Sequence, residues 1–173
     1  AKNANLQRYA EAFSFLQSKN LYTVDDLDNA LHAMQDKIDT LKKSASSKQA
    51  RIKEVDALLR MVDYYKSGKP AADKLKSIRF EKSRQKYKSE HDDELRTFYM
   101  AERKLKPYFK DGKLPITAWR REREQLEQDC KDIQTELSPL HADAKKLWAI
   151  HYNIYEVQHE QERQNTAMRQ KKQ

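Results

Sequence analysis

The sequence predicts an all-α protein, folded as a long antiparallel two-helix coiled-coil hairpin with shorter helices at its N-terminus and at a basic tip. Two stretches of about forty residues each carry apolar residues at alternating spacings of four and three, the repeat that makes helices pack along one another. The 173 residues include only two glycines and four prolines, so few tight turns are expected. Charged residues make up 36% of the chain, a load that favours an elongated molecule with a thin core.

Residues 1–22 are predicted to form a short N-terminal helix that packs on the hairpin. Its apolar positions follow a 3-4-3 spacing, which places Leu6, Tyr9, Phe13 and Leu16 on one helical face. Asn20 can end this helix, because asparagine tolerates the left-handed backbone conformation that commonly follows a helix.

The first long helix is expected over residues 23–66. Thr23 and Asp26 have the spacing of a capping box with a shorter acidic side chain, and they mark its start. The sequence Ser-Gly-Lys-Pro at 67–70 is expected to end it, because glycine and proline disfavour helix interiors. Its heptad stripe consists of Leu27, Leu31, Met34, Ile38, Leu41, Ala45, Lys48, Ile52, Val55, Leu59 and Val62.

Residues 67–116 are expected to form the basic tip, built from short helices and closed by a turn at Asp111 and Gly112. Thr117 caps the second long helix, over 117–160, in which Pro139 lies on the outer side. Residues 161–173 form a polar tail that is expected to fray. The second heptad stripe consists of Leu126, Cys130, Ile133, Leu137, Leu140, Ala144, Leu147, His151 and Ile154.

The two stripes can be aligned as antiparallel partners, in a register that sets Leu59 against Leu126 and every a position against a d position. We interpret Lys48 and His151, which interrupt the stripes, as polar residues that fix this register; a functional role is the alternative. The equal stripe lengths favour a monomeric hairpin, and a helix-exchanged dimer is the alternative.

The net charge of +8 is concentrated in one short stretch. Nine lysines and arginines between Lys66 and Lys88 oppose only Asp73 and Glu81. Closely spaced cations match the phosphates of a nucleic acid, and aromatic side chains among them can stack on unpaired bases. A solvated helix surface is the alternative interpretation. The candidate nucleic-acid-binding residues are Lys74, Lys76, Arg79, Lys82, Arg84, Lys86 and Lys88, with the aromatic residues Phe80 and Tyr87.

Sequence motifs for catalysis, cofactors or metals are absent. There is no glycine-rich phosphate loop, no paired-cysteine motif and no glycine-flanked serine, and the five histidines are scattered. We therefore expect no catalytic, cofactor-binding or metal-binding residues and no enzymatic activity. No apolar run is long enough to span a bilayer and no signal-peptide pattern opens the chain. The single Cys130 fits a reducing compartment, so a cytoplasmic location is expected.

Three segments carry a family resemblance: FLQSKNLYTVDDLDNAL (15–31), MVDYYKSGK (61–69) and GKLPITAWRREREQLEQD (112–129). In this order they resemble the C-terminal helical region of relaxases, the mobilisation nucleases of conjugative and mobilisable elements in Gram-positive gut bacteria. Those proteins nick DNA with an N-terminal domain that uses a tyrosine and a metal held by a histidine cluster. This chain has no such cluster, so the resemblance implies an accessory region without the nuclease.

Two functions of different classes follow. The first, implied by the resemblance, is a non-catalytic accessory domain that assists contacts with origin-of-transfer DNA, in single-stranded or duplex form, or with relaxosome or secretion proteins. The second is a coiled-coil spacer or protein-docking module with no role in nucleic-acid binding. Salt dependence separates them, because binding to phosphates weakens steeply as the salt concentration rises.

Overall fold

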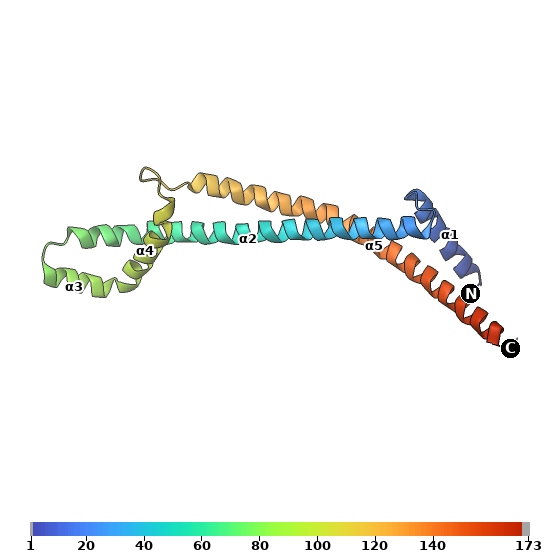
Figure 1. Ribbon diagram of the computed structural model, residues 1–173. Coiled ribbons are helices and arrows are strands. Elements are labelled where there is room, and N and C mark those ends of the chain that lie inside the picture. The colour runs from blue at the N-terminus through green and yellow to red at the C-terminus, as the bar shows by residue number, and fades with distance from the viewer. Residues whose placement is uncertain (1, 171–173) are drawn as a thin grey trace. The chain divides into compact units, whose positions relative to one another are not determined.

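The computed structural model describes residues 2–170, and the side chains of residues 7–170, as an all-α fold. The described chain has five α-helices and one 3₁₀ helix (Figure 1). They are α1 (Lys2–Ser18), α2 (Val24–Ser77), α3 (Glu81–Glu90), α4 (Asp92–Leu105), η1 (Lys106–Tyr108) and α5 (Ile116–Gln170). None of these helices is long and apolar enough to cross a membrane.

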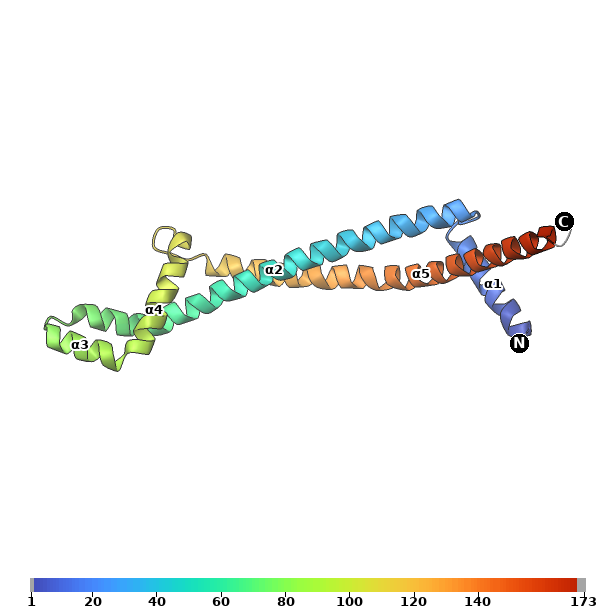
Figure 2. The same cartoon turned by 60° about the horizontal axis from the view of Figure 1, so that its bottom comes forward.

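The chain divides into two compact units. The terminal unit comprises residues 1–44 and 132–173, and the tip unit comprises residues 45–131. In each unit one part of α2 packs antiparallel against one part of α5, as the pairings of their side chains establish. Within each unit, parts of the two long helices lie beside each other (Figures 1 and 2), so the predicted helical hairpin is confirmed.

In the terminal unit, α2 begins with the capping box that the sequence predicts. The carboxylate of Asp26 accepts hydrogen bonds from the backbone N–H groups of Tyr22 and Thr23, at 3.1 and 3.0 Å. The Thr23 hydroxyl accepts one from the Asp26 N–H at 3.1 Å. These hydrogen bonds hold the pKa of Asp26 below its usual value, and the bond from the Tyr22 N–H has the largest effect. Asn20, with a φ of 56°, makes the left-handed turn before α2.

Two apolar clusters form the core of the terminal unit. One contains the buried residues Leu27, Leu31 and Leu147, against which Phe15 and Leu16 of α1 pack. The other contains Ile38, Leu137 and Ala144. The predicted apolar face of α1 is only partly correct, because Leu16 is packed but Tyr9 and Phe13 are 68% and 63% exposed.

Two further clusters form the core of the tip unit. The first joins the middle of α2 to the end of α4 and the start of α5 through Val55, Val62, Leu105 and Trp119. The second holds α2, α3 and α4 together through Ala71, Ala72, Leu75, Tyr87, Leu95 and Phe98.

The prediction that Ser-Gly-Lys-Pro at 67–70 ends the first long helix is wrong. Helix α2 continues through Gly68 and Pro70 to Ser77. A β-carbon on Gly68 would lie only 2.7 Å from the β-carbon of Phe98, so the glycine lets α4 pack directly on the backbone of α2. Packing against Phe98 and Leu95 therefore outweighs the low helix propensity of these residues.

The predicted tail also differs. Helix α5 starts at Ile116, passes through Pro139 and continues to Gln170, so residues 161–170 are helical and not frayed. The same prediction for residues 171–173 lies outside the described residues.

The predicted register of the two stripes is wrong by about one heptad. In the tip unit Leu59 packs in the cluster of Trp119, not against Leu126. Lys48 pairs with Asp129 at 2.5 Å. A shift of one heptad keeps every a position opposite a d position, so the apolar repeat cannot distinguish the two registers. Burial of the large Trp119 side chain, which is 5% exposed, favours the observed one.

Candidate nucleic-acid interface

The tip unit carries the whole net charge of the protein. Residues 45–131 contain 23 lysines and arginines and 15 aspartates and glutamates, which gives a net charge of +8. The remaining residues contain 12 of each sign and are neutral as a group. The positive charge that could attract a polyanion is therefore carried by the tip unit.

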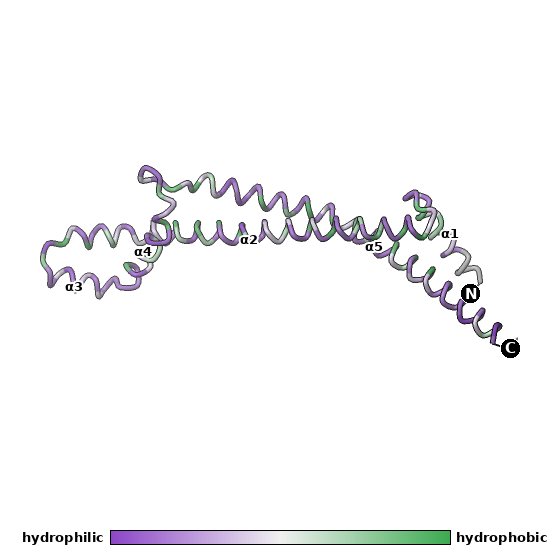
Figure 3. The backbone as a smooth tube through the Cα atoms, in the orientation of Figure 1, coloured by the Kyte–Doolittle hydropathy of each residue, from purple (hydrophilic) through white to green (hydrophobic). Residues whose placement is uncertain are grey.

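The candidate residues surround the turn that joins α2 to α3. Lys74 and Lys76 lie in the last turn of α2, and Arg79 and Phe80 lie in the connection. The other cations lie on α3, which Figure 3 shows as mainly hydrophilic. All seven candidate cations are exposed: Lys74, Lys76, Arg79, Lys82, Arg84, Lys86 and Lys88.

Local hydrogen bonds and packing determine the shape of this turn. The Ser77 hydroxyl donates to the carbonyl of Lys74 at 2.7 Å, where α2 ends. The Arg84 N–H donates to the carbonyl of Phe80 at 2.9 Å, where α3 begins. Leu75 and Tyr87 are both buried in the cluster that joins the two helices. The apolar cluster of the tip unit therefore fixes the backbone of the turn that carries the cations.

Two of the seven cations have partners within the protein. Lys86 lies 3.9 Å from a carboxylate oxygen of Glu90, one helical turn away. The Lys74 ammonium lies 5.2 Å from the centre of the Tyr87 ring. In the described part of the chain the other five make no ion pair, so they are available to donate to phosphate oxygens. These five are Lys76, Arg79, Lys82, Arg84 and Lys88.

Tyr87 does not have the role that the sequence predicts. Its side chain is only 9% exposed and belongs to the core of the tip unit. Its ring centre also lies 4.2 Å from that of His91. A base cannot stack on a ring that is covered in this way. In this structure Tyr87 is therefore not accessible for stacking, and the spacing of an aromatic residue on a short helix does not reveal which face the neighbouring helices cover.

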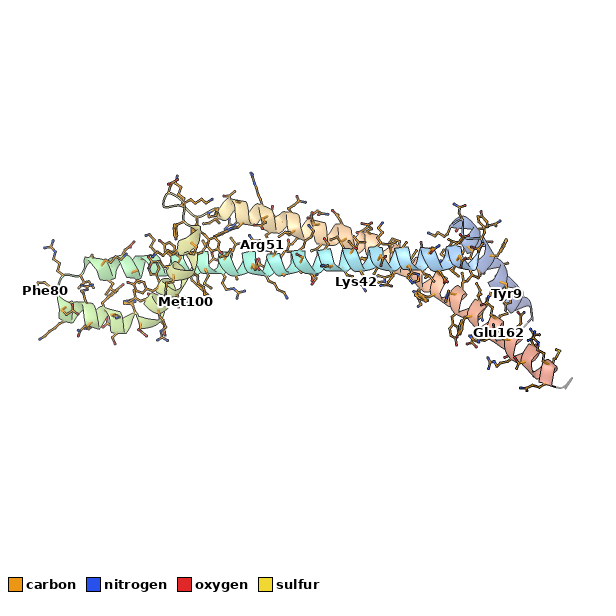
Figure 4. The ribbon with its side chains drawn as sticks, viewed as in Figure 1. Tyr9, Lys42, Arg51, Phe80, Met100 and Glu162 are labelled. Carbon is orange, nitrogen blue, oxygen red and sulfur yellow. The ribbon has the colours of Figure 1, made fainter. Side chains whose placement is uncertain are left out.

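Phe80 is accessible, in contrast to Tyr87. Its side chain is 78% exposed, and it lies at the end of the unit where α2 gives way to α3 (Figure 4). Among the predicted site residues, the structure thus brings together one accessible aromatic ring and a group of unpaired cations.

A second basic cluster lies at the turn before α5. The backbones of Lys110 and Lys113 exchange two hydrogen bonds of 2.9 Å each. Asp111 and Gly112, with φ of 49° and 74°, form the predicted turn between them. Lys104 and the lysines that flank the turn are exposed and extend the positive surface of the tip unit.

The terminal unit carries an exposed aromatic stripe that was not predicted from the sequence. Trp148, Tyr152 and Tyr155 of α5 are 50%, 61% and 51% exposed. Their 4-3 spacing places them on one face, next to the heptad stripe that contains Leu147 and Ile154. The same spacing is visible in the sequence one position beyond the main stripe, so this signal could have been found.

The polar residues that interrupt the stripes are paired across the hairpin. The His151 Nε2 lies 2.8 Å from a carboxylate oxygen of Asp28 in the terminal unit. Lys48 donates to Asp129 in the tip unit and holds the pKa of that carboxyl below its usual value. Both contacts can fix a register, as predicted for these residues, but the register is the observed one and not the one expected from the stripes.

No model of a known protein family, no curated protein and no solved structure matches this chain significantly. Among residues 2–170 no three histidine, cysteine, aspartate or glutamate side chains are grouped as metal ligands. A functional proposal for the chain therefore depends on its own geometry and charge.

Proposed function

We propose that this protein is a nucleic-acid-binding helical module whose contact surface is the basic turn of the tip unit. The observation that supports the proposal is the concentration of the entire net charge in that unit, with five exposed and unpaired cations around one turn. Each cation that neutralises a phosphate releases a counterion from the nucleic acid, and this release supplies most of the free energy of binding that is independent of sequence.

The resemblance to the C-terminal helical region of relaxases makes DNA the favoured nucleic acid. On this view the module is a non-catalytic accessory domain that assists contacts with origin-of-transfer DNA, the relaxosome or the secretion machinery.

The test is binding of the protein to labelled single- and double-stranded DNA over a series of salt concentrations. For five phosphate contacts with duplex DNA, the logarithm of the binding constant should fall with the logarithm of the salt concentration with a slope of up to about −4.5. Replacing the five unpaired cations by glutamine should abolish most of this binding. That variant carries Lys76→Gln, Arg79→Gln, Lys82→Gln, Arg84→Gln and Lys88→Gln.

A matched control removes the same charge from the terminal unit. It carries glutamine at five exposed positions, Arg8, Lys42, Lys43, Lys145 and Arg169. This control should keep most of the wild-type affinity, because its cations do not surround the turn. Equal losses in both variants would mean that only the total charge matters. Absence of binding at low salt would contradict the proposal.

The exposed aromatic stripe supports a second function, protein docking. Trp148, Tyr152 and Tyr155 form a helical face of the residue types that dominate the binding energy at protein interfaces. In that case the wild-type protein should show no salt-dependent binding to DNA. The double variant Trp148→Ala, Tyr152→Ala would instead weaken any association with a partner or with a second copy, measured by sedimentation over a range of concentrations.

A further inference from the structure

Phe80 occupies a position that neither helix capping nor packing explains. It is the N-cap residue of α3, with extended backbone angles of −85° and 127°, and its side chain makes no capping hydrogen bond. Serine, threonine, aspartate and asparagine stabilise this position because their side-chain oxygens accept hydrogen bonds from the first backbone N–H groups of the helix, and phenylalanine cannot do so. The ring is 78% exposed, so it does not contribute to the core of the tip unit.

Several other aromatic rings of the tip unit are packed against one another. Tyr65 stacks on Phe98 with ring centres 5.1 Å apart, and Phe98 meets Tyr99 edge to face at 5.2 Å. Tyr87 is buried in the same cluster. Phe80 differs from these rings because it is 78% exposed and meets no other aromatic ring among the described residues.

The surroundings of Phe80 are cationic. Arg79 precedes it, Lys82 and Arg84 follow it in the first turn of α3, and Lys76 lies in the last turn of α2. None of these four cations is paired with an acid among the described residues. An exposed hydrophobic side chain alone needs no explanation. An exposed aromatic ring between unpaired cations is the combination with which proteins bind unpaired nucleic-acid strands.

We propose that Phe80 is a base-stacking residue, and that it makes the tip unit prefer single-stranded over double-stranded nucleic acid. One unpaired base would stack on the ring while the cations on either side bind the neighbouring phosphates. In a duplex each base is already stacked on both faces, so the ring would have no surface to bind. This inference rests on the proposed function and names the form of nucleic acid that the same site takes.

The experiment compares four proteins in fluorescence-polarisation titrations with a labelled oligothymidylate and a labelled duplex of the same length. They are the wild type, Phe80→Ala, Phe80→Leu and the control Phe13→Ala, which removes an exposed aromatic ring from the terminal unit. Loss of one base–aromatic stack should weaken single-strand binding by about fivefold to a hundredfold in both Phe80 variants. Duplex binding by these variants, and all binding by Phe13→Ala, should change less than about twofold.

The variant Phe80→Trp supplies a direct signal. It should retain single-strand affinity, and its emission should be quenched by the oligothymidylate beyond the change of the wild type, which has Trp119 and Trp148. Circular dichroism should show unchanged helix content in every variant, because Phe80 lies outside the core.

The outcomes separate this inference from the proposed function. If the wild type binds and the five-cation variant does not, but Phe80→Ala binds both nucleic acids like the wild type, the function stands and the stacking role is overturned. If the wild type binds neither, both are overturned. If the emission of Phe80→Trp responds to anionic lipid vesicles and not to the oligothymidylate, the ring inserts into lipid, and the stacking role is again overturned.

Discussion

Gly68 and Phe98 pack so closely that a side chain at position 68 has no room. A β-carbon there would lie 2.7 Å from the β-carbon of Phe98 and 3.1 Å from the carbonyl oxygen of Glu94. Neither atom lies at the end of a flexible side chain, so relief requires a backbone shift. This contact joins α4 to α2 and thereby supports the turn that carries the candidate nucleic-acid-binding residues.

We predict that Gly68→Ala destabilises the protein. In an unpacked helix the substitution would add up to about 1 kcal/mol of stability, because alanine is the better helix former. Overpacking a tight contact costs typically about 1–3 kcal/mol, and at 2.7 Å this cost should exceed the gain. Thermal unfolding followed by circular dichroism measures the net effect, which should be a lower Tm.

The control for this prediction is Ser67→Ala, an exposed position in the same helical turn, which should change stability by less than about 0.5 kcal/mol. Phe98→Ala should not rescue Gly68→Ala, because alanine keeps the β-carbon that makes the contact. An unchanged or higher Tm for Gly68→Ala would show that α4 moves away at little cost.

The same contact shows what the sequence could predict of the fold. Heptad spacing predicted both long helices and their antiparallel pairing, because that pattern depends on the local period of apolar residues. The continuation of α2 through Gly68 and Pro70 was not predictable from propensity. It depends on Phe98, thirty positions along the chain from Gly68, and on the packing that this side chain finds.

The candidate site was predictable in composition but not in exposure. The seven candidate cations are all exposed, as a run of charges on a short helix predicts. Phe80 and Tyr87 are equivalent in the sequence, because both are aromatic residues among lysines and arginines. Only the packing of α3 on α2 and α4 distinguishes the exposed ring from the buried one.

The observed register predicts that the charges of Lys48 and Asp129 can be exchanged. The two side chains are half-buried and 2.5 Å apart, so Lys48→Glu or Asp129→Lys alone places like charges together across the hairpin. Each single variant should lower the Tm by a few degrees, and the double variant should recover most of the loss. In the register predicted from the heptads Lys48 would face an apolar position, and the double variant would then show no recovery.

The paired carboxylates predict a loss of stability in acid. Hydrogen bonds from Arg51 hold the pKa of Glu122 below its ordinary value of 4.5. A bond from Lys48 does the same for Asp129, whose ordinary value is 3.8. A lowered pKa in the folded state gives stability that is complete above the unfolded pKa and is lost as the pH falls through the folded pKa. The Tm should therefore be nearly constant from pH 7 to about 5 and fall below about 4.5.

Glu122→Gln provides the comparison for this pH dependence. It removes one of the titrating groups, so its Tm should be lower than that of the wild type at pH 7, and the difference should narrow as the pH falls towards 3. The acid-induced increase in positive charge acts on both proteins and cancels in the difference. A difference that does not change between pH 7 and 3 would mean that Glu122 has the same pKa in the folded and unfolded states.

The buried position of Tyr87 predicts that stability and nucleic-acid binding can be separated within α3. Tyr87→Ala removes a large side chain from the core that joins α3 to α2 and α4, and it should cost about 3–5 kcal/mol. Tyr87→Leu keeps most of the apolar volume and should cost less than about 1.5 kcal/mol. Because leucine removes the aromatic ring, this second variant also tests whether the ring contacts the nucleic acid.

We expect Tyr87→Leu to bind oligothymidylate with wild-type affinity, whereas Phe80→Leu loses affinity. Both variants replace an aromatic ring by leucine, so loss of an aromatic ring alone cannot account for a difference between them, whereas exposure can: Phe80 is 78% exposed and Tyr87 9%. Chemical denaturation measures the stabilities, and fluorescence polarisation measures the affinities at a temperature where both variants are folded. Equal losses of affinity would indicate that α3 turns to expose Tyr87 when the strand binds. A loss confined to Tyr87→Leu would assign the stacking role to the buried ring instead.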